Sequence, residues 1–191
     1  MALLSGAAAR REFDRFVTET TPGLLRDGYL LTWNLCEAED LVQETFFRTA
    51  KRWPDVRTME FPAAYARRIL FNLAIRENER HSKLNPELNG TVELDATADE
   101  RFEARILSID TRTDLESALS RLPVRQRAVI VLRYYEDLSE SQIAEMLEWP
   151  VGTVKSTSSR ALDELRKTFS DSVNSPSAAS PEAVRSSRGE K

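Results

Sequence analysis

The stretch SQIAEMLEWPVGTVKS, residues 141–156, decides the fold of the C-terminal part of the chain. It consists of a short amphipathic run, a Trp-Pro break and a second run that opens on Val-Gly-Thr. Ser139, with Gln142 three residues later, makes a capping-box pattern that starts the first helix. Pro150 ends that helix and allows a second one to begin near Val151. Two helices separated by so short a break predict a helix-turn-helix, a common device for placing a helix in a DNA groove.

The second helix of this motif has two different faces. At 100° per residue, the buried stripe is expected to hold Val151, Val154, Ala161, Leu162 and Leu165. The opposite face and its shoulders hold Gly152, Thr153, Lys155, Ser156, Ser159 and Arg160. Arginine can bond guanine through two hydrogen bonds, serine can bond bases or phosphate, and lysine neutralises phosphate. The alternative is a solvated face of an ordinary helical hairpin, but the tight spacing and the small side chains favour DNA binding.

Composition limits the remaining possibilities. The 191 residues suffice for one medium domain or two small ones. Glycine is scarce, at 6 residues, and apolar residues recur at intervals of three and four, which predicts an all-α fold. We expect no membrane span and no signal peptide, and therefore a cytoplasmic location. The single cysteine, Cys36, excludes an internal disulfide, and only His81 could accompany it as a soft ligand, so we expect neither metal nor cofactor.

The chain divides into four segments. Two compact helical domains are predicted at 10–83 and 112–169. The linker 84–111 contains Asn-Pro and Asn-Gly turns and carries 7 acidic against 2 basic residues, so we expect it to be flexible. The tail 170–191 is rich in Ser, Ala and Pro, which predicts disorder.

In the first domain, AEDLVQETFFRTAKRW, residues 38–53, predicts an amphipathic helix. Its apolar side holds Leu41, Val42, Thr45, Phe46, Thr49, Ala50 and Trp53. Its other side presents Asp40, Gln43, Glu44, Phe47 and Lys51. A phenylalanine among carboxylates and an amide is typical of a site where another protein's helix docks. Alternatively, Phe47 packs against an earlier helix at 24–31, and the sequence leaves both interpretations open.

A second helix is predicted at 62–81, PAAYARRILFNLAIRENERH. Its buried side is expected to hold Ala66, Ile69, Leu70, Leu73 and Ala74. This leaves Tyr65, Arg68 and Asn72 along one exposed strip, where a ring, a guanidinium and an amide could stack on and hydrogen-bond unpaired bases. Alternatively, the tyrosine shields a neighbouring helix and the arginines pair with Glu77 and Glu79. The interpretation as a site for unpaired bases is favoured only because the same chain also contains a predicted duplex-reading domain.

Taken together, the two domains resemble a bacterial RNA polymerase sigma factor of the sigma-70 family, in the extracytoplasmic-function group. The resemblance covers roughly residues 12–168 and is strongest to a mainly actinobacterial, SigE-like branch. AEDLVQETFFRTAKRW is similar to the core-binding helix of sigma domain 2, and YARRILFNLAIRENERH to its minus-ten-reading helix. LSRLPVRQRAVIVLRYYEDLSESQIAEMLEWPVGTVKSTSSRALDELRK is similar to sigma domain 4.

The resemblance implies a role for each surface. Asp40, Gln43, Glu44 and Phe47 would face the β′ coiled coil of core polymerase. Tyr65, Arg68 and Asn72 would hold melted minus-ten DNA. Lys155, Ser156, Ser159 and Arg160 would read the minus-thirty-five duplex. The implied partners are core RNA polymerase, through its β′ coiled coil and β flap, promoter DNA and an anti-sigma factor, with the free chain a monomer.

The sequence departs from the family pattern at two places. Thr157 and Ser158 stand where relatives often have a basic residue and then Leu or Ile, so we expect a weaker packing stripe and one phosphate contact fewer. Trp33 and Asn34 stand where a Gly-Asp turn is common, so we expect a different approach to the core-binding helix.

Three function classes compete on this evidence. The first is a non-enzymatic promoter-specificity subunit of polymerase. The second is a stand-alone helix-turn-helix repressor or activator, which would bind its operator alone and as a dimer. The third is a helical adaptor for other proteins, which would not need Arg160 or Asn72. An enzyme is the least favoured class, because the sequence has no phosphate-binding glycine loop and no nucleophile near His81.

Overall fold

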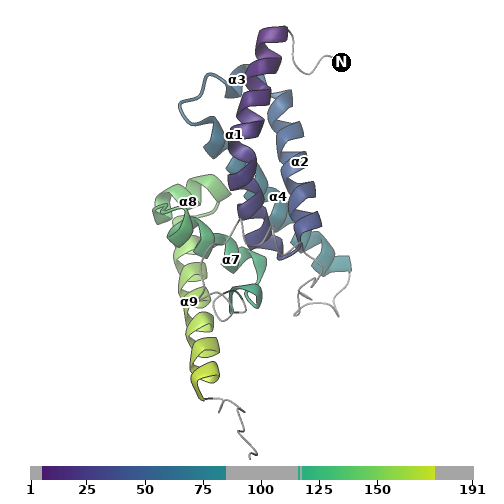
Figure 1. Cartoon of the computed structure of the whole chain (residues 1–191). Helices are drawn as coiled ribbons and strands as arrows, with labels where there is room; N and C mark the ends of the chain where they lie inside the picture. The colour runs from purple at the N-terminus through teal and green to yellow at the C-terminus, as the bar shows by residue number, and fades with distance from the viewer. Residues whose placement is uncertain (1–5, 85–115, 117, 175–191) are drawn as a thin grey trace, which may run out of the picture.

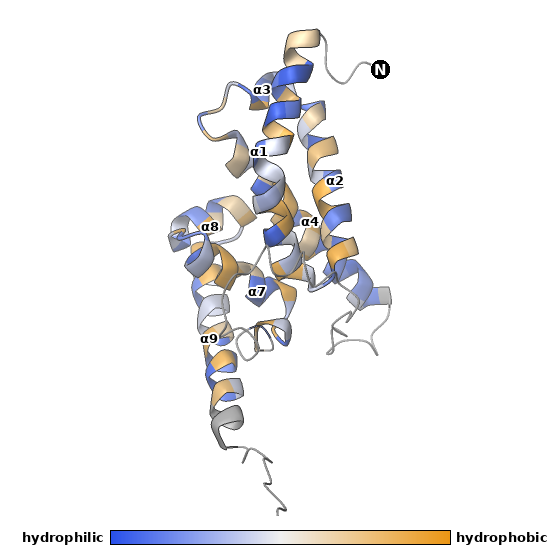
Figure 2. Ribbon diagram, in the orientation of Figure 1, coloured by the Kyte–Doolittle hydropathy of each residue, from blue (hydrophilic) through white to orange (hydrophobic). Residues whose placement is uncertain are grey.

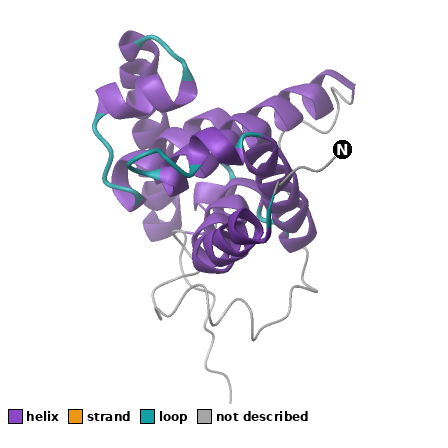
Figure 3. Ribbon diagram, turned by 90° about the horizontal axis from the view of Figure 1, so that it is seen from above, coloured by secondary structure: helices purple, strands orange, loops and turns teal. Residues whose placement is uncertain are grey.

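A computed structural model describes residues 6–84, 116 and 118–174. Within these ranges the backbone consists of helices and loops without a strand (Figure 3), which confirms the predicted all-α class. The N-terminal part holds α1 (Ala7–Thr32), α2 (Leu35–Lys51), α3 (Trp53–Val56) and α4 (Pro62–Leu84). The C-terminal part holds α7 (Val124–Ile130), the π-helix η2 (Val131–Tyr135), α8 (Glu140–Leu147) and α9 (Val151–Asn174). No helix in the part of the chain that the structure describes is long and apolar enough to cross a membrane.

Helices α1, α2 and α4 pack side by side and bury their apolar faces against one another (Figure 1). At one end, Phe13 and Phe16 of α1 meet Phe46 of α2 and Trp53 of α3, with ring centres 5.0 to 6.5 Å apart. Tilted and edge-on arrangements of this kind favour aromatic pairs. The cluster fixes the direction in which α2 leaves α1, and with it the outward face of α2.

The turn between α1 and α2 accounts for the departure at Trp33 and Asn34. Trp33 ends α1 at a φ of 56°, and its N–H donates to the Tyr29 carbonyl oxygen at 2.7 Å. Such left-handed backbone costs a non-glycine residue about 1–2 kcal/mol, which the burial of the indole at 2 % exposure offsets. Asn34 then begins α2, because its side-chain oxygen accepts a hydrogen bond from the Glu37 N–H at 3.1 Å.

The helix-turn-helix forms as predicted. The Ser139 hydroxyl accepts from the Gln142 N–H, and the Gln142 side chain accepts from the Ser139 N–H at 2.8 Å, so the capping box is complete. Ile143, Ala144 and Leu147 are buried on the inner face of α8. Glu148 follows at a φ of 58° and turns the chain towards α9.

The packing stripe of α9 differs from the prediction. Val154, Ala161 and Leu165 are buried as expected, and Leu162 is half-buried. Val151 is 41 % exposed, because it lies in the first turn, before the helix reaches its neighbours. Thr157 takes a place in the stripe instead, at 8 % exposure, and the sequence expected no phosphate contact from it. Figure 2 shows the resulting alternation of hydrophobic and hydrophilic residues along α9.

The two parts of the chain share one hydrophobic core. Leu31, Trp33, Leu70 and Phe71 belong to the same buried cluster as α7, η2 and α8 residues such as Leu132. Helix α7 contacts α1 and α4, and α8 contacts α4. The domain limits 10–83 and 112–169 stay predictions, although α9 continues through Asn174, past the second limit. Most of the predicted linker and tail, 85–111 and 175–191, lies outside the described residues.

Candidate nucleic-acid interface

The outward face of α2 is polar around one exposed ring. Asp40 and Gln43 are exposed and Glu44 is half-buried. Phe47 is 45 % exposed, with the Lys51 Nζ 4.0 Å from its ring centre. The neighbouring Phe46, and not Phe47, packs against α1. The alternative in which Phe47 packs against the first helix is therefore wrong, and the outward face of α2 carries an exposed aromatic side chain.

The outward face of α9 is exposed and ordered by contacts within the helix. Lys155, Ser156, Ser159 and Arg160 are all exposed. The Arg160 Nε donates to the Ser156 carbonyl oxygen at 3.2 Å, and its Nη2 donates to the Ser156 hydroxyl at 3.3 Å. The Lys155 Nζ lies 3.9 Å from a Glu140 carboxylate oxygen. The sequence-predicted duplex-reading residues thus lie together on a surface that is open to a ligand.

The sequence predicted an exposed strip on α4, but the structure shows this strip partly covered. Tyr65, Arg68 and Asn72 are each half-buried, and Arg68 and Asn72 contact the C-terminal part of the chain. Arg68 Nη2 forms an ion pair with the Glu148 carboxylate, rather than with Glu77 or Glu79. The Asn72 side-chain amide donates to the Met146 carbonyl oxygen at 3.1 Å and to the Arg68 carbonyl oxygen at 2.9 Å. One long-range contact reaches Glu148, in the turn between α8 and α9, and the other reaches Met146, in the last turn of α8.

The buried side of α4 is also broader than the sequence indicated. Phe71 and Ile75, which the sequence did not assign to the core, are 0 % and 6 % exposed, whereas the predicted core residue Ile69 is half-buried. The reason is that α4 packs on two sides, against α2 and against α7 and α8. The spacing of apolar residues within α4 predicts one buried side and therefore missed the second.

A cationic pocket of about 500 Å³ lies beside the strip, between α2, α4 and the α8–α9 turn. Its charged and aromatic lining consists of Arg48, Lys51, Arg52, Tyr65, Arg68, Arg76 and Glu148. Sequence reasoning did not use Arg48 and Arg52, although the basic cluster RTAKRW at the end of α2 was a signal for them. A pocket with this many cations attracts an anion such as a nucleic-acid phosphate.

Beneath the pocket, a polar network joins the two parts of the chain. Arg67 Nε donates to Asp27 Oδ2 at 2.7 Å, and Arg67 Nη1 lies 2.7 Å from Glu136 Oε2. Arg26 lies 3.9 Å from Glu136 and stacks on the Tyr135 ring at 4.4 Å. Burial raises the pKa of Asp27 from 3.8 to about 6, and the Arg67 guanidinium opposes this rise.

Arg127 of α7 is a further residue that sequence reasoning missed. Its side chain is 1 % exposed, and burial lowers its pKa to about 10. It donates to the carbonyl oxygens of Leu31 at 2.5 Å, Leu119 at 3.1 Å, Ser120 at 2.7 Å and Leu122 at 2.9 Å. One guanidinium thereby satisfies carbonyls near the end of α1 and carbonyls of the segment before α7. A basic residue inside the apolar run VRQRAVIVL was the signal for it.

No group of three or more His, Cys, Asp or Glu side chains that could hold a metal ion occurs within residues 6–84 and 118–174.

Comparison with known proteins identifies both parts of the chain. The family model described as sigma-70 region 2 matches residues 27–83, and the one described as sigma-70, region 4 matches residues 112–165. The RNA polymerase sigma-E factor of Streptomyces avermitilis is 36 % identical over 157 residues, which are 82 % of this chain and 84 % of that protein. The ECF RNA polymerase sigma factor SigW of Bacillus subtilis is 32 % identical over 151 residues, or 75 % and 81 % of the two chains.

The solved structure of the sigma factor RpoE from Bartonella quintana, in complex with the anti-sigma factor NepR, covers 84 % of this chain and 98 % of its own. It has a TM-score of 0.58 at 21 % identity, which shows a shared fold. With the helix-turn-helix formed and both sigma regions matched in order, the hypothesis of a polymerase specificity subunit prevails over the stand-alone repressor and the adaptor. The chain belongs to the sigma-70 family of RNA polymerase sigma factors, in its extracytoplasmic-function group, and directs promoter-specific initiation of transcription.

Proposed function

We propose that three surfaces divide the work of this sigma factor. The α2 face, defined as Asp40, Gln43, Glu44 and Phe47, docks on the β′ coiled coil of core polymerase. The α4 strip, defined as Tyr65, Arg68 and Asn72, binds melted minus-ten DNA. The α9 face, defined as Lys155, Ser156, Ser159 and Arg160, reads the minus-thirty-five duplex while its domain contacts the β flap.

The observation that carries this proposal is the presence of two separate polar surfaces of different chemistry in one chain. The α9 face is small, hydroxylated and cationic, which suits base edges in a major groove. The α4 strip lies beside the cationic pocket and adds an aromatic ring, which suits unpaired bases that stack. A protein that reads only duplex DNA needs the first surface and not the second.

The α2 face fits a protein partner better than DNA. It combines Phe47, 45 % exposed, with the carboxylates of Asp40 and Glu44. Carboxylates repel DNA phosphate but complement a basic helix. An exposed aromatic side chain supplies the apolar anchor on which interfaces between proteins commonly depend.

Run-off transcription of genomic fragments with purified core polymerase, with and without this protein, tests the division of labour. We expect new start sites only when both are present. The free protein should retain promoter fragments poorly, because each of its DNA contacts is weak alone. Tight promoter binding by the free protein, without an effect of core polymerase, would contradict the proposal.

Replacing Gln43 and Glu44 together by alanine tests the α2 face. We expect weaker binding to core polymerase with any promoter, because the substitutions remove an amide and a carboxylate from the docking surface. A pull-down with core polymerase measures the effect. The matched control is Glu77→Ala with Asn78→Ala, two exposed residues of α4 outside the docking face, and equal retention of both double variants would refute the assignment.

We further propose that the chain acts in the cytoplasm as a monomer when free, without cofactor or metal, and that polymerase alone performs the chemistry. The B. quintana RpoE structure contains an anti-sigma factor, which supports a partner of the same class here. Such a partner would compete for the polymerase-binding surfaces.

A further inference from the structure

An ion pair between Lys155 and Glu140 joins the α9 face to the first turn of α8. The Lys155 Nζ lies 3.9 Å from a Glu140 carboxylate oxygen, and the two side chains are 63 % and 38 % exposed. Lysine on a duplex-reading surface neutralises phosphate. The ammonium of Lys155 therefore has an anionic neighbour within the chain itself before any DNA is bound.

Helix geometry explains why Glu140 reaches α9. At about 100° per residue, Glu140 shares one side of α8 with Ile143 and Leu147, which are buried. Helix α8 packs against α9. The capping box between Ser139 and Gln142 fixes the first turn of α8, which begins at Glu140. The fold thereby places this carboxylate beside the α9 face.

Helix α8 is acidic where a helix-turn-helix approaches the phosphates. In this motif the first helix crosses the DNA backbone while the second lies in the major groove. A helix in that place gains affinity from lysine and arginine, which neutralise phosphates. Helix α8, with the sequence ESQIAEML, contains two glutamates and no basic residue. Its first residue, Glu140, adds a negative charge close to the lysine that would neutralise a phosphate.

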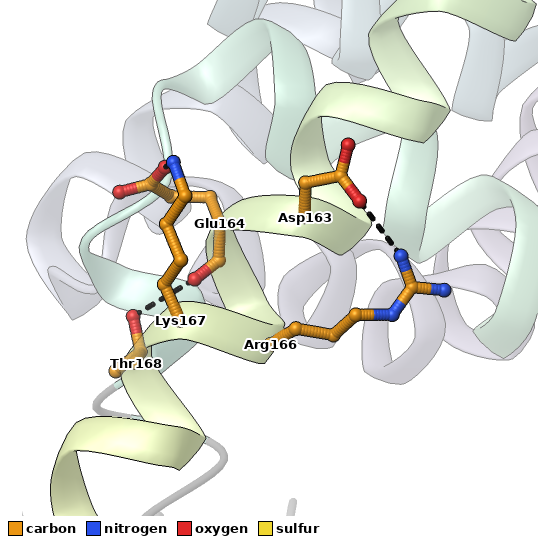
Figure 4. A network of polar contacts seen from close by, with 5 residues as sticks. All are labelled: Asp163, Glu164, Arg166, Lys167 and Thr168. Atoms are coloured by element: carbon orange, nitrogen blue, oxygen red, sulfur yellow. Dashed lines mark hydrogen bonds and ion pairs between the residues drawn. The ribbon is translucent and has the colours of Figure 1, made fainter.

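Two further cations of α9 are also paired with carboxylates. Arg166 and Lys167 each pair with the acidic residue three positions earlier, at 2.7 Å and 3.4 Å (Figure 4). Arg160 differs, because its hydrogen bonds in the part of the chain that the structure describes go to neutral groups of Ser156. The positive charge of α9 is thus compensated by carboxylates except at Arg160, whose guanidinium suits a guanine edge.

The pair between Lys155 and Glu140 is weak enough for DNA to displace. Both side chains are partly exposed, and an exposed ion pair changes a binding constant by a factor of about two to five. A carboxylate and a phosphate offer lysine the same negative charge. The pair therefore lowers the affinity for the DNA backbone, which is the same for every sequence, without closing the α9 face.

We propose that Glu140 is a positioning residue that competes with DNA phosphate for Lys155 and so lowers the affinity of the α9 face for duplex DNA of any sequence. The inference rests on the proposed function of that face. Base contacts such as those of Arg160 are unaffected, so they contribute a larger share of the remaining affinity. The free chain thereby spends less time on DNA of random sequence.

The first test replaces Glu140 by glutamine in the full chain. Fluorescence anisotropy at low salt measures binding to a fluorescein-labelled duplex with the minus-thirty-five element of a mapped promoter, and to a duplex of scrambled sequence. We expect Glu140→Gln to bind both about two- to five-fold more tightly, with an unchanged ratio between them. The slope of log K against log salt should steepen by up to about 0.9, the value for one more neutralised phosphate.

The matched control is Glu145→Gln on the same helix. Glu145 is exposed and lies about 140° around α8 from Glu140, so the variant makes the same charge change away from Lys155. Glutamine keeps the size of each side chain, and neither change touches the capping box of α8. Equal affinities and equal salt slopes of the two variants would overturn the inference.

Replacing Lys155 by glutamine separates the inference from the proposed function. Lys155→Gln should weaken binding to both duplexes, because it removes a phosphate contact. In the Lys155→Gln chain, Glu140→Gln should have no larger effect than Glu145→Gln, because no lysine is left to compete for. A full gain from Glu140→Gln in that chain would contradict the competition and leave the α9 face in place. Unchanged binding by Lys155→Gln alone would instead refute the place of Lys155 in the proposed function, and the inference with it.

Discussion

The α9 face and the α4 strip contain similar chemistry but lie in opposite environments. On α9, the hydrogen bonds of Arg160 within the described residues all go to Ser156, one turn earlier in the same helix, so a ligand can replace these contacts at little cost. On α4, Arg68 and Asn72 bond to residues about 75 positions away in the sequence, across the interface. The comparison teaches that a ligand's access to a polar surface depends on what packs against that surface as well as on its composition.

The largest expected effect comes from breaking the interface at its buried cation. Arg127→Ala leaves several buried carbonyls without donors, so we expect the free energy of unfolding to fall by about 3–5 kcal/mol. Urea denaturation measures it. Arg125→Ala makes the same charge change at an exposed ion pair and should cost less than about 1 kcal/mol. Equal losses in the two variants would show that Arg127 does not hold the two parts together.

The next largest effect is a pH dependence of the free energy of unfolding, which arises from Asp27, the partner of Arg67 on α4. Because burial raises the pKa of Asp27 from 3.8 to about 6, the folded chain binds this proton more readily than the unfolded chain. The proton on Asp27 therefore stabilises the fold fully below pH 3.8, and this contribution is lost as the pH rises through about 6. The free energy of unfolding falls by at most about 3 kcal/mol over this range. Asp27→Asn should remove this part of the slope, as seen in denaturation at a series of pH values. Identical slopes for both proteins would contradict the prediction.

The third effect concerns the open surface. Arg160→Ala should weaken promoter binding by the polymerase-bound protein by about 1–3 kcal/mol if the guanidinium meets a base. Electrophoretic mobility shifts at fixed salt measure the change. Arg166→Ala, further along α9 and paired with Asp163 (Figure 4), serves as the control of equal charge. Unchanged transcription from a mapped promoter after Arg160→Ala would remove this residue from the α9 face.

The smallest expected effect concerns α8, the helix that leads into the turn at Glu148. Ser139→Ala removes the hydroxyl that caps α8, so we expect the free energy of unfolding to fall by about 1 kcal/mol. Thermal or urea denaturation measures the change. Ser141→Ala, an exposed position inside the same helix, should change it by less. A larger loss for Ser141 would place the stabilisation of α8 elsewhere.

Patterns within single helices were predictable from the sequence, and contacts between helices were not. The capping box at Ser139 depends on residues within one turn, so local rules sufficed, whereas they left the outward and the packed position of Phe47 both open. The burial of Phe71, Ile75 and Arg127 depends on a second layer of helices, which no periodicity in α4 or α7 reports. Polar residues on the α4 strip indicated exposure, and the structure shows that a polar strip is also able to bind a polar turn. Val151 was placed in the core because its position in the period fits, although at the first residue of α9 it is 41 % exposed.

The positions of the three tryptophans give the chain an optical property. Trp33, at 2 % exposure, has its ring centre 5.9 Å from the Arg127 guanidinium, and Arg125 stacks on Trp149 at 4.3 Å. Trp53 lies apart from both, in the aromatic cluster of α1 to α3. Separation of the two parts of the chain would bring water to Trp33 and remove the Arg127 guanidinium from it. Trp149 and Arg125 lie in the same part and stay together, and Trp53 keeps its surroundings. The emission spectrum of the unlabelled protein is therefore expected to shift to longer wavelength as the interface opens, which provides an intrinsic signal for timing that step.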